Sequence, residues 1–279
     1  MELEWHDLAD GAAQPVVSLG SPSGHPVVLL PGLTDGLAPL TDPDARAQMA
    51  SPPGELLDEF RVHVASHRFP APAEVTTEQL AQDAAELIGV LTDRPVTIVA
   101  HSMGAMVAQH LVARHPHLVA RMVLSCTVGR ADDAFRAVLD EWAGPVRAGD
   151  WREVYTGAID RSYTGSAWLS RRVAQRVLPL KEPPPELAAR HLALTHACAT
   201  HDALDGLHDV TVPVLVLAGS LDRVTGPHHA RQLGGALPDA TVEVWDGLGH
   251  GLPEQAAARF GRRVRRFLDT TADVTRSVP

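Results

Sequence analysis

The sequence predicts an α/β fold in which a mostly parallel central sheet is flanked by helices and carries a helical insertion. Three observations lead to this prediction. Short apolar runs recur at wide spacing, amphipathic helical patterns lie between them, and one long stretch contains helices but no convincing strand. The chain has 279 residues, of which 45% are hydrophobic, and this composition is ordinary for a globular protein with a sizeable core.

Seven segments have the character of strands. The clearest is Val96 to Ala100, because an uninterrupted apolar run suits a parallel strand that is buried on both faces. The other six are Val16 to Leu19, Val27 to Leu30, Arg61 to Ala65, Arg121 to Cys126, Val214 to Ala218 and Val242 to Trp245.

Helical patterns separate these strands. Residues 78 to 91 place apolar side chains at intervals of three and four, which is typical of an amphipathic helix. We expect further helices over residues 102 to 115, 227 to 233 and 254 to 268. The alternation of strands and helices indicates a parallel sheet that is covered by helices.

Residues 128 to 209 interrupt the alternation. They have helical patterns, broken at Gly144-Pro145, at Gly165 and at the run Pro183-Pro184-Pro185. Because the interruption lies between two strands of one sheet, we expect a lid over the carboxyl edge of the sheet. The predicted division is therefore a core of residues 1–127 and 210–279, with a lid of residues 128–209.

The segment Ala100-His101-Ser102-Met103-Gly104 joins a predicted strand directly to a predicted helix. A serine on such a tight, strained turn projects its hydroxyl above the sheet. The N–H of Met103 would then point into the site at a helix N-terminus, where an oxyanion is favoured. The alternative is a tight turn in which Ser102 only caps the helix.

With the following helix and its closing His115-Pro116, this segment resembles the nucleophile elbow of the α/β-hydrolase superfamily. Alanine stands at position 100, where many members have glycine. Two later segments match the family in its order of serine, acid and histidine. The strand from Val214 is followed by Gly219-Ser220-Leu221-Asp222, and the flexible loop Asp246-Gly247-Leu248-Gly249-His250-Gly251 follows the last strand.

The resemblance implies a catalytic role for each of these residues. Ser102 would be the nucleophile, His250 the general base and Asp222 the acid that orients it. Asp246 lies four residues before His250 and competes as the acid. We favour Asp222 because it follows a strand, at the edge where the other parts lie.

The loop Pro31-Gly32-Leu33-Thr34-Asp35-Gly36 resembles the family's His-Gly-x loop, with proline in place of histidine. The resemblance implies that the N–H of Leu33 joins that of Met103 as an oxyanion donor; a plain turn is the alternative. We expect Thr34 and Asp35 to face the substrate pocket. Asp35 there could bind substrate or act as an acid in non-hydrolytic chemistry.

The predicted lid is rich in aromatic residues, while the rest of the chain has few. An aromatic lid over a catalytic cleft favours a fairly bulky, apolar acyl or ring substrate. Equally, these residues could only hold the lid on the core. The candidate pocket residues in the lid are Trp142, Trp151, Tyr155 and Trp168.

Composition argues against several other functions. A net charge of −10 does not fit a nucleic-acid-binding protein. No apolar run approaches the ~20 residues of a membrane span, and residues 1–5 do not begin a signal peptide, so we expect a cytoplasmic protein with free thiols at Cys126 and Cys198.

No metal or cofactor is expected either. Adjacent His228 and His229 do not share a helix face, and neither this pair nor His196 with His201 forms a recognised ligand set. The chain has no glycine-rich phosphate loop, so no nucleotide or flavin is expected. The sequence does not reveal the oligomeric state.

Three functions fit these features. The first is a serine hydrolase that cleaves an ester, lactone or related carbonyl bond through an acyl-enzyme on Ser102. The second is a non-hydrolytic enzyme of the same fold in bacterial secondary metabolism, such as a cyclase, a lyase or a cofactor-free haloperoxidase-like catalyst. The third is a binding protein that retains a vestigial triad.

Overall fold

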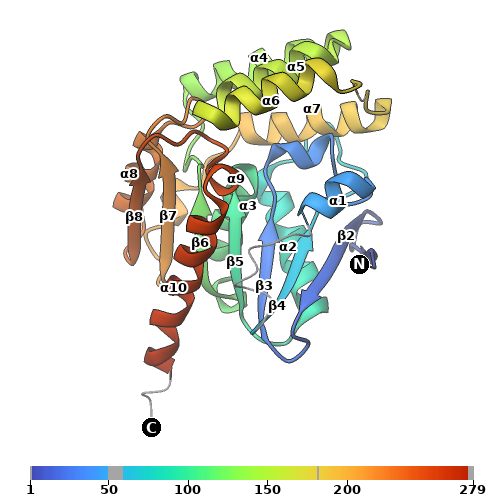
Figure 1. Cartoon of the computed structure of the whole chain (residues 1–279). Helices are drawn as coiled ribbons and strands as arrows, with labels where there is room; N and C mark the ends of the chain where they lie inside the picture. Colours follow the sequence, from blue (N-terminus) through green and yellow to red (C-terminus); the bar gives the residue numbers. More distant parts are fainter. Residues whose placement is uncertain (1, 50–58, 181, 276–279) are drawn as a thin grey trace.

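The structure is a computed structural model that describes residues 2–49, 59–180 and 182–275. Eight strands form one sheet in the order β1-β2-β4-β3-β5-β6-β7-β8 (Figure 1). The β1–β2 and β2–β4 pairs are antiparallel and the other five pairs are parallel, so the sheet is mostly parallel. The predicted fold class is confirmed.

The seven expected strands are present, with ends displaced by a few residues at most. The eighth, β1 (Glu4–Asp7), was not predicted, because it is a mostly exposed edge strand with charged side chains and no apolar run. The others are β2 (Ala13–Gly20), β3 (His25–Leu30), β4 (Phe60–Ala65), β5 (Val96–His101), β6 (Val119–Ser125), β7 (Val214–Gly219) and β8 (Ala240–Trp245).

Helices cover both faces of the sheet, as the alternating side chains of the central strands require. In β5, Ile98 packs with the helices of one face, while Val99 packs in a second apolar cluster on the other face. The first face is covered by α2 (Thr77–Leu91), α3 (Met103–Arg114) and α8 (Pro227–Ala236). The second is covered by α10 (Ala257–Thr275), which follows the short α9 (Leu252–Gln255). A further helix, α1 (Pro43–Met49), lies between β3 and β4 in the sequence.

Among the residues that the structure describes, four α-helices lie between β6 and β7 and form a layer across one end of the sheet (Figure 1). The break expected at Gly144-Pro145 does not occur, because Pro145 lies inside the first of these helices, which ends where Gly149 adopts a left-handed conformation with φ 70°. The helices are α4 (Asp133–Ala148), α5 (Trp151–Ser162), α6 (Gly165–Val177) and α7 (Pro185–Ala199). No helix in the described part of the chain has the length and apolar character that a membrane span needs.

Candidate active site

Ser102 stands at the turn between β5 and α3 in a strained backbone conformation, with φ 53° and ψ −117°. A left-handed φ is costly for a residue other than glycine and persists only where the surroundings impose it. Here the Ser102 N–H donates to the Ser125 carbonyl at 2.9 Å, and the Ser102 carbonyl accepts from Thr127 Oγ1 at 3.0 Å. These contacts with the end of β6 hold the turn that lifts the serine hydroxyl out of the sheet.

Two glycines allow the backbone to pack closely around this serine. A Cβ on Gly104 would overlap the carbonyl oxygen of Leu30, so only glycine lets α3 begin directly against β3. A Cβ on Gly32 would lie 3.1 Å from that of Ser102. The loop after β3 therefore lies against the serine, as the sequence led us to expect.

Ser102, His250 and Asp222 form a continuous hydrogen-bonded chain. His250 Nε2 lies 3.0 Å from Ser102 Oγ, and His250 Nδ1 lies 3.0 Å from Asp222 Oδ2. All three residues are buried, and the Asp222 side chain is fully enclosed. The competing acid, Asp246, is exposed and accepts a hydrogen bond from Ser220 Oγ instead.

The environment of Asp222 favours its charged form. Burial by itself would raise the pKa of this carboxyl, but the charge of His250 and hydrogen bonds outweigh burial and hold the pKa well below its usual range. Besides His250, the carboxylate accepts from the Val224 and Thr225 N–H groups and from Thr225 Oγ1, at 2.7 to 3.0 Å. An ionised, fixed Asp222 can keep the His250 proton on Nδ1, which leaves Nε2 free to accept from Ser102.

The glycines on either side of His250 are explained by close packing rather than by the flexibility we expected. A Cβ on Gly249 would lie 2.6 Å from the Ser162 carbonyl oxygen, and one on Gly251 would overlap the Tyr163 ring. The Gly251 N–H also donates to the Ser162 carbonyl at 2.8 Å. The turn between α5 and α6 thus packs directly on the histidine loop.

A second imidazole, that of His101, lies beside His250, with ring centroids 5.1 Å apart. Ser125 Oγ donates to the Ala100 carbonyl, so it can accept a hydrogen bond from His101 Nδ1–H at 3.1 Å. Burial lowers the pKa of His101 to about 3, and the ring therefore stays neutral beside the His250 imidazole. Sequence reasoning treated His101 only as a motif residue and missed this contact.

The two expected oxyanion donors occupy suitable positions in the chain. Met103 is the first residue of α3, where a backbone N–H has no partner within the helix. Leu33 begins a short 3₁₀ turn, η1 (Leu33–Gly36), and comes directly after Gly32, the residue that lies against Ser102. Both side chains are buried, so each backbone segment is anchored in the core.

Asp35 does not face a pocket, and that expectation is corrected. Its side chain is fully buried, and Oδ2 accepts from Arg190 at 2.6 Å and from the His67 N–H at 3.0 Å. Arg190, from α7 of the insertion, also donates to the carbonyls of Asp35, His67 and Arg68. This ion pair holds the loop that carries Leu33. The neighbouring Thr34 is exposed.

The aromatic residues of the insertion have different surroundings. Trp151 is buried in a small apolar cluster where the insertion meets Leu37, and Trp142 packs against the main core. Both contacts agree with the packing role, which was the alternative to a pocket role. Tyr155 lines a hollow of about 250 Å³ between the insertion and α1. Trp168 lines a larger hollow, which also reaches Asp222.

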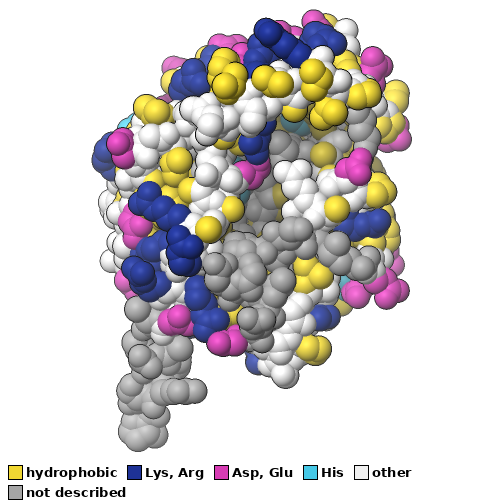
Figure 2. Space-filling view, viewed as in Figure 1, with side chains coloured by type: hydrophobic (Ala, Val, Ile, Leu, Met, Phe, Trp, Pro, Cys, Tyr) yellow, Lys and Arg dark blue, Asp and Glu magenta, His cyan; other side chains and the backbone are white. Residues whose placement is uncertain are grey.

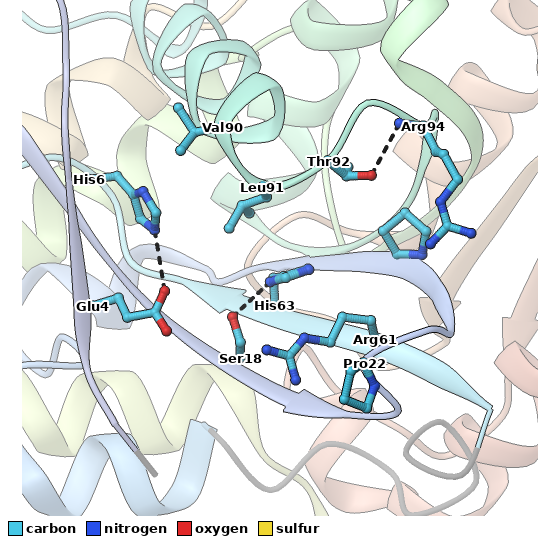
Figure 3. Close-up of a pocket in the computed structure, with 11 residues that line it drawn as sticks. Glu4, His6, Ser18, Pro22, Arg61, His63, Val90, Leu91, Thr92 and Arg94 are labelled. Atoms are coloured by element: carbon cyan, nitrogen blue, oxygen red, sulfur yellow. Dashed lines mark hydrogen bonds and ion pairs between the residues drawn. The ribbon is translucent and has the colours of Figure 1, made fainter.

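This larger hollow has a volume of about 710 Å³ and lies between the α5–α6 turn and the loop that carries Asp222. On the face seen in Figure 2, the surface is recessed below the layer formed by the insertion. Another hollow, of about 290 Å³, lies beside β2 and β4 and contains no triad residue (Figure 3). The larger hollow is lined by Asp160, Tyr163, Thr164, Gly165, Trp168, Ser220, Leu221, Asp222 and Arg223.

Comparison with known proteins agrees with the observed fold. A family model described as the alpha/beta hydrolase fold matches residues 25–257. BpoC of Mycobacterium tuberculosis, provisionally named a non-heme bromoperoxidase, is 28% identical over 194 residues, which cover 63% of this chain and 68% of BpoC. A pimeloyl-[acyl-carrier protein] methyl ester esterase of Neisseria meningitidis is 26% identical over 195 residues, covering 68% of this chain and 62% of the esterase.

Among solved structures, the enol-lactonase from Burkholderia xenovorans LB400 superposes with a TM-score of 0.78. The superposition covers 95% of this chain and 100% of the lactonase, at 20% sequence identity. At that identity the likeness shows a shared fold and does not transfer the substrate.

Proposed function

The chain belongs to the α/β hydrolase fold family, and from this premise we propose that it is a serine hydrolase that cleaves an ester or lactone of a fairly apolar small molecule. The observation that carries the proposal is the buried chain from Ser102 Oγ through His250 to Asp222, with both contacts at 3.0 Å. A serine that only capped α3 would need no such chain, and Ser102 makes no side-chain cap hydrogen bond.

The proposed reaction has two halves. Ser102 Oγ attacks the carbonyl carbon while its proton passes to His250 Nε2, and the Leu33 and Met103 N–H groups bind the oxyanion. The tetrahedral intermediate expels the alcohol, which takes the proton from His250, and an acyl-enzyme remains. Water then attacks that ester with His250 again as base, which releases the acid and restores Ser102.

We also propose that the insertion acts as a lid that completes the site. Its α5–α6 turn contacts the His250 loop, and its Arg190 holds the Leu33 loop. In this proposal Trp168 and Leu221 supply apolar surface to the substrate, in the hollow beside Asp222. The named activities of the methyl ester esterase and the enol-lactonase support a carboxylic ester or lactone as the substrate class.

A second candidate is a non-hydrolytic reaction of the cyclase, lyase or cofactor-free haloperoxidase type. The similarity to BpoC favours it, because that relative is named for halide oxidation rather than hydrolysis. Both candidates place the reaction at the same triad, and they differ in whether an acyl-enzyme on Ser102 forms and is hydrolysed. The expected cytoplasmic location and a small molecule as the partner stay predictions.

A fluorophosphonate probe tests the hydrolase proposal. We expect the probe to label the wild-type chain and Ser170→Ala, a control at an exposed serine of α6, and not Ser102→Ala. We also expect turnover of p-nitrophenyl esters by the labelled proteins only. Absence of both labelling and ester turnover in the wild type would contradict the proposal, and halide oxidation with hydrogen peroxide would then support the second candidate.

A further inference from the structure

Three side chains with metal-binding atoms converge away from the triad, where the insertion joins the core. Asp132 precedes α4, and His228 and His229 lie in the first turn of α8. Asp132 Oδ2 lies 3.4 Å from Nε2 of His228 and 3.2 Å from Nε2 of His229. Each of the three residues therefore offers one ligand atom, and these three atoms lie within 4.8 Å of one another.

These separations fit a bound ion. Zinc binds imidazole nitrogen and carboxylate oxygen at about 2.0–2.1 Å with tetrahedral geometry, which places neighbouring ligand atoms about 3.3–3.4 Å apart. The oxygen–nitrogen distances of 3.2 and 3.4 Å are close to that value. The His228 contact of 3.4 Å is a long hydrogen bond, and the His229 contact of 3.2 Å lies at the upper end of the usual range of about 2.7–3.2 Å.

The surroundings of His229 orient its ring as a metal ligand would be oriented. Its Nδ1 faces Gln232 Oε1 at 3.2 Å, and because an amide oxygen accepts, Nδ1 carries the proton. The neutral ring then directs the lone pair of Nε2 toward the Asp132 carboxylate. His229 is only 3% exposed, and Nε2 has no hydrogen-bond partner in the described residues, so a cation between the two acceptors would relieve their repulsion.

Asp132 is held in place as well. Its Oδ1 accepts from the Phe135 N–H at 2.8 Å, which caps α4 and leaves Oδ2 directed at the two histidines. The side chains of His228 and Asp132 are 63% and 41% exposed, so the open side of the cluster faces solvent. A water molecule can therefore supply a fourth ligand.

We propose that Asp132, His228 and His229 bind one Zn²⁺ ion that fastens α4 of the insertion to α8 of the core. Sequence reasoning set the two histidines aside because adjacent residues do not share a helix face. At the start of α8, however, both rings reach the same oxygen of a residue 96 or more positions away. The site is independent of the proposed hydrolase function.

Isothermal titration of the chelator-treated, untagged full chain with zinc chloride tests this site. We expect one Zn²⁺ per chain in the wild type and at least a tenfold weaker affinity in His229→Ala and Asp132→Asn. Asparagine caps helices as well as aspartate does, so Asp132→Asn reports on the ligand rather than the cap. The exposed His208→Ala is the matched control and should bind as the wild type does.

Zinc should also raise the melting temperature of the wild type and of His208→Ala, but not of the two ligand variants. His228→Ala keeps the test valid if the buried His229 substitution impairs folding, because the His228 side chain is mostly exposed. Unchanged affinity in His228→Ala and Asp132→Asn would overturn the proposal. So would loss of binding in Cys126→Ser alone, since Cys126 lies with Asp222 and His250 in a second cluster of ligand atoms.

Discussion

The buried ion pair between Asp35 and Arg190 offers a sharp test of how the insertion supports the site. Its side chains are 0% and 3% exposed, and the two charged atoms lie 2.6 Å apart. Asp35→Asn keeps the shape of the side chain but leaves the guanidinium buried without its counter-charge. Breaking one partner of a buried pair typically costs about 3–5 kcal/mol, and we expect the lower end because Arg190 keeps its three carbonyl partners.

The same substitution should also affect catalysis, because Asp35 lies two residues after Leu33 in one short turn. Complete loss of one oxyanion donor costs about 3 kcal/mol, or about 10²–10³ in kcat. Loosening of the loop should remove part of this stabilisation of the oxyanion. We therefore expect kcat to fall by about tenfold or more, with a smaller change in KM.

Urea unfolding and ester kinetics measure the two effects separately. Asp93→Asn, at an exposed carboxylate, is the control and should leave both unchanged. The double variant Asp35→Leu/Arg190→Met removes both charges and should recover much of the free energy of unfolding. A free energy of unfolding for Asp35→Asn within about 0.5 kcal/mol of the wild-type value would refute this account of the clamp.

Three further outcomes are expected. In Gly251→Ala the new Cβ overlaps the Tyr163 ring, so kcat should fall at least tenfold. The double variant Gly251→Ala/Tyr163→Ala should recover part of the lost kcat. An equal loss of kcat in the single and the double variant would contradict the packing explanation. Asp222→Asn should lower kcat by about 10⁴ while Asp246→Asn changes it less than twofold, and similar losses in the two variants would contradict the assignment of the acid. Burial holds the pKa of His63 at about 4 and those of His101, His191 and His201 at about 3 to 4, below the value near 6.5 of the unfolded chain. The contribution of these histidines to the free energy of unfolding is therefore fully present above pH 6.5 and is lost as the pH falls from 6.5 toward 4, by at most about 1.4 kcal/mol per pH unit for each histidine. Urea unfolding between pH 6 and 5 should show a dependence on pH that His63→Gln reduces by about one proton, and an unchanged dependence would refute this prediction.

The parts of the site that sequence reasoning located are those encoded by short segments. A buried strand, a serine between small residues and a helix are all contained in residues 96–114, and the chain order of Ser102, Asp222 and His250 supplied the rest. The fold class could be predicted from the period of apolar residues, which depends only on local burial. The polar edge strand β1 has no such period and was missed.

The parts that were missed depend on contacts between distant residues. Asp35 looked like a pocket residue because its partner, Arg190, lies 155 positions away in the insertion. The glycines beside His250 suggested a flexible loop, but the Ser162 carbonyl that requires a small residue there comes from the α5–α6 turn. No local pattern reports which helix of an insertion packs on which loop of the core.

The central claim is that Ser102 carries the acyl group, and intact-protein mass spectrometry tests it most directly. After rapid acid quenching of a reaction with an activated aryl ester, we expect one added acyl mass per chain, located by proteolysis on the peptide that contains Ser102. Ser102→Ala should show no adduct under the same conditions. An adduct on another residue, or ester turnover that persists in Ser102→Ala, would contradict the account.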